Sequence, residues 1–277
     1  MSNQVEKALR FRALHNADNS FIMPNPWDIG TARLLADIGF EALATTSAGY
    51  AFSRGLADNC VGRELVIAHV AEIAAATDLP INADLENGFG DTPEVVAETI
   101  RMAAQAGAVG GSIEDSTNRV GDPIYPFELA VERVRAAVEA ARGLAFKFTL
   151  TARCENYFLG KPDLTDTIKR LQAYQEVGAD VLFAPGLKTR ADLEVLMRSV
   201  DRPVNVMMAI QGSDLGQSQL AAMGVKRLSV GGSLALAAFG AFMRAAQELK
   251  NHGTFEYVNH GALSREMNQI FRRLNSR

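Results

Sequence analysis

Residues 79–90 read Leu79-Pro80-Ile81-Asn82-Ala83-Asp84-Leu85-Glu86-Asn87-Gly88-Phe89-Gly90, a short apolar run that ends in two acidic side chains. The same arrangement returns at residues 109–115, where an apolar run leads into Glu114 and Asp115. Short apolar runs closed by acids are typical of buried parallel strands that deliver oxygen atoms to one edge of a sheet. The two stretches therefore predict a parallel sheet with carboxylates gathered at its carboxyl edge.

On either side of these stretches, short β-type runs alternate with longer amphipathic runs. We expect strands at residues 21–23, 42–46, 81–83, 110–113, 147–152, 181–184, 204–207 and 227–230. We expect the intervening helices at residues 29–37, 63–76, 93–106, 127–142, 163–177, 190–200, 216–223 and 234–250. Asp28 can cap the first of these helices, and Pro93 suits the first position of the third.

Eight β/α repeats in one chain predict an α/β fold, a TIM (β/α)8 barrel. No linker rich in Pro, Gly or Ser interrupts the repeats, so we expect a single domain over residues 1–277, with a C-terminal helical extension over about residues 251–277. An open doubly wound sheet is the alternative. It is weakened because no G-x-G-x-x-G pattern follows the first expected strand.

The composition argues against several classes of protein, namely those that bind nucleic acid, depend on disulfides or zinc, or span a membrane. The chain has 277 residues, 48% of them hydrophobic and 22% charged, with a net charge of −4, which gives no reason to expect nucleic-acid binding. Its two cysteines, Cys60 and Cys154, make neither a disulfide framework nor a zinc motif. The first residues lack an apolar signal core, and no apolar run approaches the ~20 residues of a membrane span. We therefore expect a cytoplasmic protein with no membrane partner.

The active site of a barrel lies at the carboxyl ends of its strands. The residues expected there are Asn25, 47–49, Asp84, Glu86, Glu114, Arg153, 184–185, Asn205 and 231–233. Carboxylates in such a set suit a divalent cation such as Mg²⁺, which can polarise a substrate carbonyl and stabilise an enolate. Arg153 can contact a substrate carboxylate with two hydrogen bonds, and backbone amides of residues 47–49 can donate to developing negative charge.

Each of these signals also has a plainer interpretation. Glu114 and Asp115 alone would suit a helix cap or a surface pair, and Arg153 could pair with Glu155. Ser47 could be an ordinary turn residue. Residues 231–233 could hold a phosphate at a helix start or form a tight turn. None of the four histidines, at positions 15, 69, 252 and 260, lies at an expected strand end, so structural or solvated roles are favoured for them.

Several motifs resemble those of the isocitrate lyase/phosphoenolpyruvate mutase superfamily. In order along the chain they are Asn25-Pro26-Trp27-Asp28, Thr45-Thr46-Ser47-Ala48-Gly49-Tyr50, Gly55-Leu56-Ala57-Asp58-Asn59, Asp84-Leu85-Glu86-Asn87-Gly88-Phe89-Gly90, Ile113-Glu114-Asp115 and Thr151-Ala152-Arg153. The resemblance covers roughly residues 21–208. It implies a barrel that is usually a homotetramer, with a dimer as the alternative, whose C-terminal helix is swapped between subunits.

The resemblance also implies Mg²⁺, with Mn²⁺ as the alternative, and an enolpyruvate-type intermediate. Carried over residue by residue, it makes Asp84 the direct metal ligand. Asp58, Glu86 and Glu114 would hold the metal through water. The remaining roles implied are oxo-acid binding by Ser47, Ala48 and Gly49, and carboxylate binding by Arg153, with catalysis assigned to Ser47, Asp58 and Arg153. The rim position of Asn205 adds it to the residues expected to bind substrate.

The chain also departs from that pattern. Isocitrate and methylisocitrate lyases carry a K-K-C-G-H loop whose Cys acts as an acid, whereas residues 116–123 here contain neither Cys nor His. Glu86 replaces the second Asp of the metal motif. The enolate-stabilising half of the machinery remains, and this half is sufficient for decarboxylation. The best single prediction is therefore a Mg²⁺-dependent carbon–carbon lyase acting on a small 2-oxo acid or dicarboxylate of the oxaloacetate type.

Four alternatives stay open. The first is P–C chemistry, as in a phosphonopyruvate hydrolase or phosphoenolpyruvate mutase, and the second is a 2-methylisocitrate lyase-like reaction that would need an unidentified acid. The third is a non-catalytic barrel that binds oxo acids, and the fourth a phosphosugar isomerase-like barrel that uses residues 231–233. Specificity for the far end of the substrate is expected in the loop of residues 116–126, whose Arg119 and Tyr125 are candidates for substrate contact.

Overall fold

Eight parallel strands form the centre of the molecule in the computed structural model, which describes residues 3–209 and 212–276. They are β1 (Phe21–Met23), β2 (Leu43–Ala44), β3 (Ile81–Asp84), β4 (Gly110–Glu114), β5 (Thr149–Arg153), β6 (Val181–Phe183), β7 (Val204–Met207) and β8 (Arg227–Ser229). Their order is β1-β8-β7-β6-β5-β4-β3-β2. Between the two end strands the Ala44 amide donates to the Pro24 carbonyl (3.1 Å). The predicted TIM barrel, here nearly closed, is confirmed.

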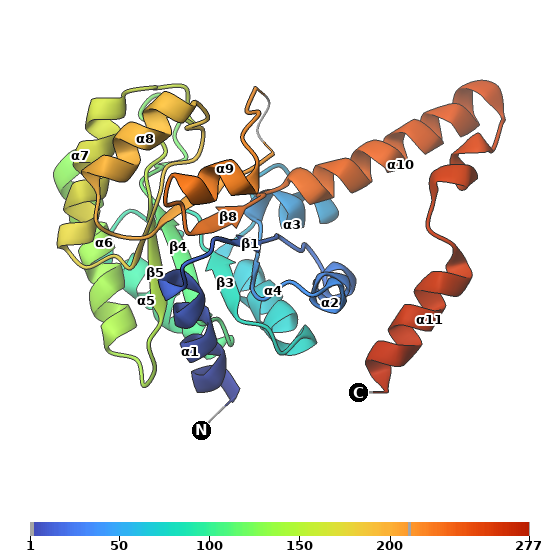
Figure 1. Ribbon diagram of the computed structural model, residues 1–277, viewed down its shortest axis with the longest axis horizontal. Helices are drawn as coiled ribbons and strands as arrows, with labels where there is room; N and C mark the ends of the chain where they lie inside the picture. Colours follow the sequence, from blue (N-terminus) through green and yellow to red (C-terminus); the bar gives the residue numbers. More distant parts are fainter. Residues whose placement is uncertain (1–2, 210–211, 277) are drawn as a thin grey trace.

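One helix or more follows each strand, and most of these helices cover the outside of the barrel (Figure 1). The helices that the repeats predicted are α2 (Ile29–Ile38), α4 (Arg63–Ala76), α5 (Pro93–Gln105), α6 (Phe127–Arg142), α7 (Leu164–Glu176), α8 (Arg190–Ser199), α9 (Gln217–Ala222) and α10 (Ser233–His252). Two helices were not predicted, α1 (Asn3–Asn16) and α3 (Ser47–Ser53). Helix α1 has little amphipathic pattern to recognise, and α3 is too short for periodicity to show.

Local signals account for where the helices begin and end. The Asp28 side chain accepts from the Thr31 amide at the start of α2 (2.7 Å), and Gly39 ends that helix with φ of +105°. Pro93 occupies the first turn of α5. Both predicted start signals are confirmed, so the chain enters these helices by ordinary local chemistry.

The two ends of the barrel are closed differently. At the amino ends of the strands, Ala8 and Phe11 of α1 are buried against Phe21 of β1 and against Val109. At the carboxyl ends of the strands, α3 follows β2 directly and places polar groups rather than apolar ones near the opening. The amino end is therefore plugged by an apolar helix face, and the carboxyl end is left to polar side chains.

The C-terminal segment extends away from the barrel (Figure 1). Helix α10 is followed by the short 3-10 helix η1 (Glu256–His260) and by α11 (Ser264–Asn275), in which no residue is buried. Arg273 of α11 pairs with Asp37 of α2 through two contacts of 2.7 Å. Among the described residues, no helix combines the length and the apolar character needed to cross a membrane.

Candidate active site

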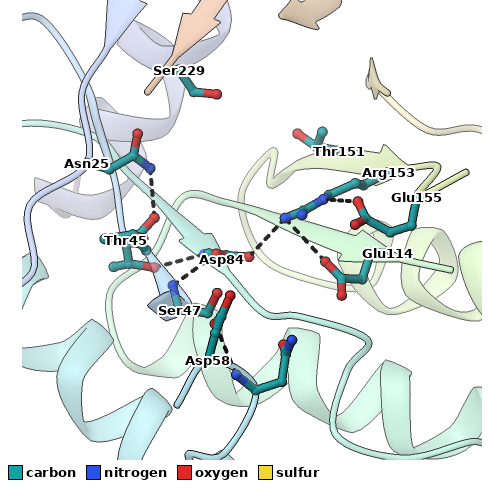
Figure 2. A network of polar contacts seen from close by, with 12 residues as sticks. Asn25, Thr45, Ser47, Asp58, Asp84, Glu114, Thr151, Arg153, Glu155 and Ser229 are labelled. Carbon is teal, nitrogen blue, oxygen red and sulfur yellow. Dashed lines mark hydrogen bonds and ion pairs between the residues drawn. The ribbon is translucent and has the colours of Figure 1, made fainter. Parts of the chain in front are cut away.

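Asp84, the last residue of β3, is at the centre of the polar network at the barrel mouth (Figure 2). Its Oδ2 accepts from the Ser47 amide (3.0 Å), and its own amide donates to Thr45 Oγ1 (2.8 Å). The turn between β2 and α3 therefore orients this carboxylate. The second oxygen, Oδ1, is buried and makes no hydrogen bond. A buried carboxylate oxygen without a partner is costly unless a cation or a donor occupies the space beside it.

Glu86 provides a second oxygen of this kind. The side chain is 3% exposed, and its Oε1 has no hydrogen-bond partner. Burial raises the pKa of Glu86 to about 8, helped by the negative charges of Asp84 and Asp58. Its backbone has φ of +49°, in the left-handed region that a side chain with a Cβ rarely adopts. The chain thus holds Glu86 in an unfavourable conformation that keeps its carboxyl group at the mouth.

Arg153, at the end of β5, is the cation of the network (Figure 2). Parallel pairing places it beside Glu114 of β4, and its Nη1 lies 3.2 Å from Glu114 Oε2 and 3.8 Å from Asp84 Oδ1. Its Nε donates to Glu155. Burial alone would lower the pKa of Arg153, but the carboxylates of Glu114, Glu155 and Asp84 raise it above its usual range. The guanidinium is charged at any physiological pH and neutralises part of the acidic cluster.

The remaining predicted acids approach the same point. Burial raises the pKa of Glu114 well above its ordinary value, with Arg153 opposing that effect. Asp58 lies in the loop after α3, and burial together with the nearby charge of Asp84 raises its pKa, while a hydrogen bond with the Ser47 side chain lowers it. Figure 2 shows Asp58 beside Ser47. The structure therefore brings Ser47, Asp58, Asp84, Glu86, Glu114 and Arg153 to one mouth.

The donor set determines which cation could be held there. Within residues 3–209 and 212–276, no three His, Cys, Asp or Glu side chains form a ready-made cluster of direct ligands. Among the described residues, Asp84 Oδ1 and Glu86 Oε1 are buried carboxylate oxygens that accept no hydrogen bond, so both are available to a cation. This set fits Mg²⁺, which takes oxygen ligands and usually keeps several waters while one or two carboxylates hold it. A bound cation would also favour the ionised form of Glu86.

The three residues at the start of α3 that were predicted to bind an oxo acid differ in whether their backbone amides are already hydrogen-bonded. The Ser47 amide is used by Asp84, and the Gly49 amide donates to Thr46 Oγ1 (3.2 Å). A Cβ on Gly49 would lie 2.6 Å from the Thr46 side chain, so glycine is needed there for packing. The Ala48 amide makes no hydrogen bond to another described residue. Of the predicted backbone donors, Ala48 is thus the one left free for a ligand.

Asn205, the other residue predicted to bind substrate, lies deeper in the barrel and is buried. Its Oδ1 accepts from Arg227 Nε (2.9 Å), and its Nδ2 donates to Ser229 Oγ (3.0 Å). It lines a cavity of about 50 Å³ whose walls also include Asp84 and Arg153. Its polar groups are therefore used mainly to bind neighbouring side chains below the mouth.

Tyr125, a candidate for substrate contact, is instead part of the protein interior. Its hydroxyl donates to Asp91 Oδ1 (2.6 Å), its ring lies 4.0 Å from the Arg133 guanidinium, and Arg119 pairs with the same Asp91 (2.8 Å). The expectation that Tyr125 contacts substrate is wrong for this conformation, because the ring is fully buried. Sequence alone does not reveal this, since the partner Asp91 is 34 residues away.

Two residues support the site in ways that their positions in the sequence did not predict. Thr45 holds the Asp84 backbone, and Asn25 links three strand ends by donating to the Thr45 carbonyl (2.9 Å) and accepting from the Val230 amide (3.0 Å). Asn25 was expected at the rim but without a role. One sequence feature could have indicated the role of Thr45, since it is a hydroxyl residue at the end of an apolar strand. Glu155, weighed as a structural partner of Arg153, does bind it.

The chain is similar to several known proteins. The family model described as phosphoenolpyruvate phosphomutase matches residues 11–250. A solved structure from Burkholderia cenocepacia J2315, described provisionally as a lyase or mutase, is 57% identical over 98% of this chain and 97% of that chain, with a TM-score of 0.95. The 2-methylisocitrate lyase of Bacillus subtilis (strain 168) is 29% identical over 73% of this chain and 67% of its own length. The oxaloacetate decarboxylase of Marinomonas sp. (strain MWYL1) is 28% identical over 78% of this chain and 76% of its own length.

Proposed function

Because the chain belongs to the phosphoenolpyruvate phosphomutase family, and with it to the isocitrate lyase/phosphoenolpyruvate mutase superfamily of enzymes, we propose that it is a divalent-metal-dependent lyase that decarboxylates an oxaloacetate-like 2-oxo acid. The observation that carries the proposal is the pair of buried oxygens on Asp84 and Glu86 that accept no hydrogen bond and lie near the Arg153 guanidinium. A named oxaloacetate decarboxylase among the relatives supports the choice of substrate class.

Asp84 and Glu86 would hold the cation, with Asp58 and Glu114 binding its water ligands. When bound, such a cation supplies electrophilic polarisation of a 2-oxo group and neutralises the charge that develops on it. The protein supplies the rest. The Arg153 guanidinium is positioned to donate to the substrate carboxylate through Nη2, which makes no hydrogen bond to another described residue.

The Ala48 amide provides the second positioned donor, at the start of α3, where the helix terminus favours negative charge. In the reaction the bond between C3 and the departing carboxyl carbon breaks, CO₂ leaves, and the electron pair moves toward the 2-oxo group to give pyruvate enolate. Protonation at C3 by solvent completes pyruvate. No step requires a cysteine acid, consistent with a loop at residues 116–126 that contains neither Cys nor His.

A steady-state assay tests the proposal. Oxaloacetate and Mg²⁺ are incubated with the enzyme, and pyruvate is followed with lactate dehydrogenase and NADH after subtraction of the enzyme-free reaction. We expect Asp84→Ala to lower kcat/KM by about a hundredfold or more, because it removes a cation ligand. Asp18→Ala, at an exposed carboxylate away from the mouth, is the matched control and should leave the rate unchanged. Rates that survive Asp84→Ala would exclude the proposal.

A second candidate, P–C bond chemistry on phosphonopyruvate, is favoured by the description of the matching family. Phosphorus NMR separates the two, since hydrolysis would yield inorganic phosphate and a mutase would yield an enol phosphate. A spectrum of phosphonopyruvate that does not change with enzyme and Mg²⁺ removes this candidate.

Two further readings stay testable in the same experiments. A 2-methylisocitrate lyase-like reaction is disfavoured by the missing Cys and His, and release of pyruvate and succinate from that substrate would restore it. A non-catalytic barrel would bind oxalate in the presence of Mg²⁺ by calorimetry yet turn over none of these substrates.

A further inference from the structure

A second pocket lies at the opposite end of the barrel from the acidic mouth. It has a volume of about 260 Å³ and is formed where the end of α1 meets the starts of β5, β6 and β7. Thr149 and Val181, the first residues of β5 and β6, line it, whereas the proposed reaction uses Asp84 and Arg153 at the strands' carboxyl ends. Buried side chains inside the barrel, Arg227 among them, lie between the two openings, so a ligand here is not part of the proposed chemistry.

Basic side chains dominate the lining of this pocket. Four cations, Arg12, Arg142, Lys147 and Arg202, face one carboxylate, that of Asp180. They come from separate parts of the chain: α1, the end of α6, the segment before β5 and the segment before β7. The whole chain carries a net charge of −4, so this accumulation of positive charge runs against the average of the molecule. Like charges gathered in a concave surface raise the local concentration of counter-ions.

The single carboxylate in this lining, that of Asp180, already forms an ion pair with one of the four cations, Arg142. Arg142 binds Asp180 with two contacts, Nη2 to Oδ1 (2.8 Å) and Nη1 to Oδ2 (3.1 Å), and it also donates to the Gly178 carbonyl (2.9 Å). Asp180 further accepts from the Leu150 amide (2.9 Å). This pair is a fixed structural contact that ties α6 to the start of β6.

The other three cations are unpaired. None of Arg12, Lys147 and Arg202 forms an ion pair or a side-chain hydrogen bond with any other residue in the described ranges. Asn16 and Thr149 add an amide and a hydroxyl to the same lining. The pocket thus offers three free positive charges and two neutral polar groups around a space as large as about nine water molecules at ~30 Å³ each.

We propose that this pocket, formed by Arg12, Lys147 and Arg202 at the amino end of the barrel, binds a small polyanion that carries at least two phosphate or carboxylate groups. Three separated cations are a better match for one molecule that carries several negative groups than for a single monovalent anion. The volume suits a molecule of the size of pyrophosphate or a small tricarboxylate. A concave pocket of this size favours such a ligand over a macromolecule, which would need an extended basic surface.

Calorimetric titration of the full-length protein tests the proposal. Pyrophosphate and citrate serve as probes at constant ionic strength, and the protein is first stripped of metal on a chelating resin so that neither probe binds through a metal at the mouth. We expect one molecule to bind per chain, with an affinity that falls about tenfold for each cation removed in Arg12→Gln, Lys147→Gln and Arg202→Gln. Preference for pyrophosphate would identify a phosphorylated ligand, and preference for citrate a polycarboxylate.

Arg135→Gln is the matched control, because it removes an exposed arginine of α6 that does not line the pocket. It should leave the affinity unchanged. Each variant is first checked for an unchanged Tm without ligand. The proposal is overturned if neither probe binds, if the three variants bind as well as Arg135→Gln, or if pyruvate, a monocarboxylate expected at the mouth, displaces the probe.

Discussion

At the scale of single residues, Arg153 shows how the site depends on charge balance. Its guanidinium lies among Glu114, Glu155 and Asp84, all partly or fully buried. Removing one charged side chain from a buried cluster leaves the opposite charges unpaired. The resulting loss in the free energy of unfolding is larger than the net stabilisation that the intact ion pair provides. The arginine is therefore needed for stability as well as for the proposed binding of a substrate carboxylate.

We expect Arg153→Lys to lower both activity and stability. An ammonium cannot contact Glu114 through one nitrogen and Glu155 through another in the fixed plane of a guanidinium. The expected loss is about 3 kcal/mol in the free energy of unfolding, measured with urea, and about a hundredfold in kcat/KM for oxaloacetate. Arg101→Lys, in an exposed pair with Glu98, is the control. A variant as stable as the control would contradict this account of Arg153.

His15, which lies far from the mouth, is expected to make the free energy of unfolding depend on pH. Burial, reinforced by the adjacent Arg227, lowers the pKa of His15 from 6.5 to about 3. Its Nδ1 contacts the Phe11 carbonyl (2.8 Å), and its Nε2 lies 3.3 Å from Arg227 Nη1, an arrangement that suits a neutral ring. The unfolded chain binds a proton below pH 6.5 and the folded chain does not, so the free energy of unfolding must fall as the pH drops from about 6.5 toward 3.

At about pH 5 this effect should have removed about 2 kcal/mol of stability relative to pH 7.5. His15→Gln retains a group that can accept from Arg227 but has no titration of its own, so its urea stability should vary less with pH by that amount. His252→Gln, at an exposed histidine, should keep the wild-type dependence. Identical pH profiles for wild type and His15→Gln would show that His15 is not responsible.

At the scale of elements, helix α6 fixes the loop that carries the acidic motif. Arg133 of α6 is 1% exposed and donates to the carbonyls of Gly90 (2.6 Å) and Asp91 (2.5 Å), and also to that of Asn87. These carbonyls belong to the segment directly after Glu86. A helix on the outside of the barrel therefore determines the path of the backbone that positions a proposed metal ligand.

We expect Arg133→Met to destabilise the protein by about 3 kcal/mol, because it leaves buried carbonyls without donors. Mg²⁺ affinity, measured by calorimetry, should fall as well, since the loop after Glu86 loses its anchor. Arg135→Met, two positions along the same helix and exposed, is the control for both measurements. Unchanged stability together with unchanged Mg²⁺ binding would show that the loop holds its path without Arg133.

At the scale of the whole molecule, the C-terminal segment is unusual for a monomer. Its exposed apolar side chains include Phe242 (69%) and Phe255 (65%), together with Leu236, Met243, Val258 and Leu263. Figure 1 shows α10 extending from the barrel, and α11 is joined to α2 by the contacts between Arg273 and Asp37. Apolar area of this extent along one segment is typical of a contact surface. This observation supports the prediction of a homo-oligomer.

We expect the protein to be a dimer or tetramer at micromolar concentration, measured by size-exclusion chromatography with light scattering. The double variant Phe242→Glu with Phe255→Glu should lower the mass, because charge on a buried apolar interface is unfavourable. Val120→Glu alters a fully exposed apolar residue elsewhere and should leave the mass unchanged. A wild-type protein that is monomeric over the whole concentration range would refute the prediction.

The sequence by itself determined the architecture and the identity of the acids. Eight alternations of short apolar runs with amphipathic ones sufficed to predict the barrel. Asp84, Glu86, Glu114 and Arg153 were identified because each lies at a strand end or within two residues of one. These features are local: side-chain period and position along a run can be read without knowing which elements are neighbours. Start signals such as Asp28 and Pro93 were readable for the same reason.

Only the tertiary structure decided which groups these residues meet. Thr45 binds the Asp84 backbone, Asp91 binds Tyr125, and Arg133 binds the loop after Glu86. Each of these contacts joins residues that are 34 to 46 positions apart in the chain. The basic pocket at the opposite end joins residues 12, 147 and 202 in the same way. Such contacts follow from strand register and helix packing, which are set by the whole barrel at once and leave no periodic trace in any one segment.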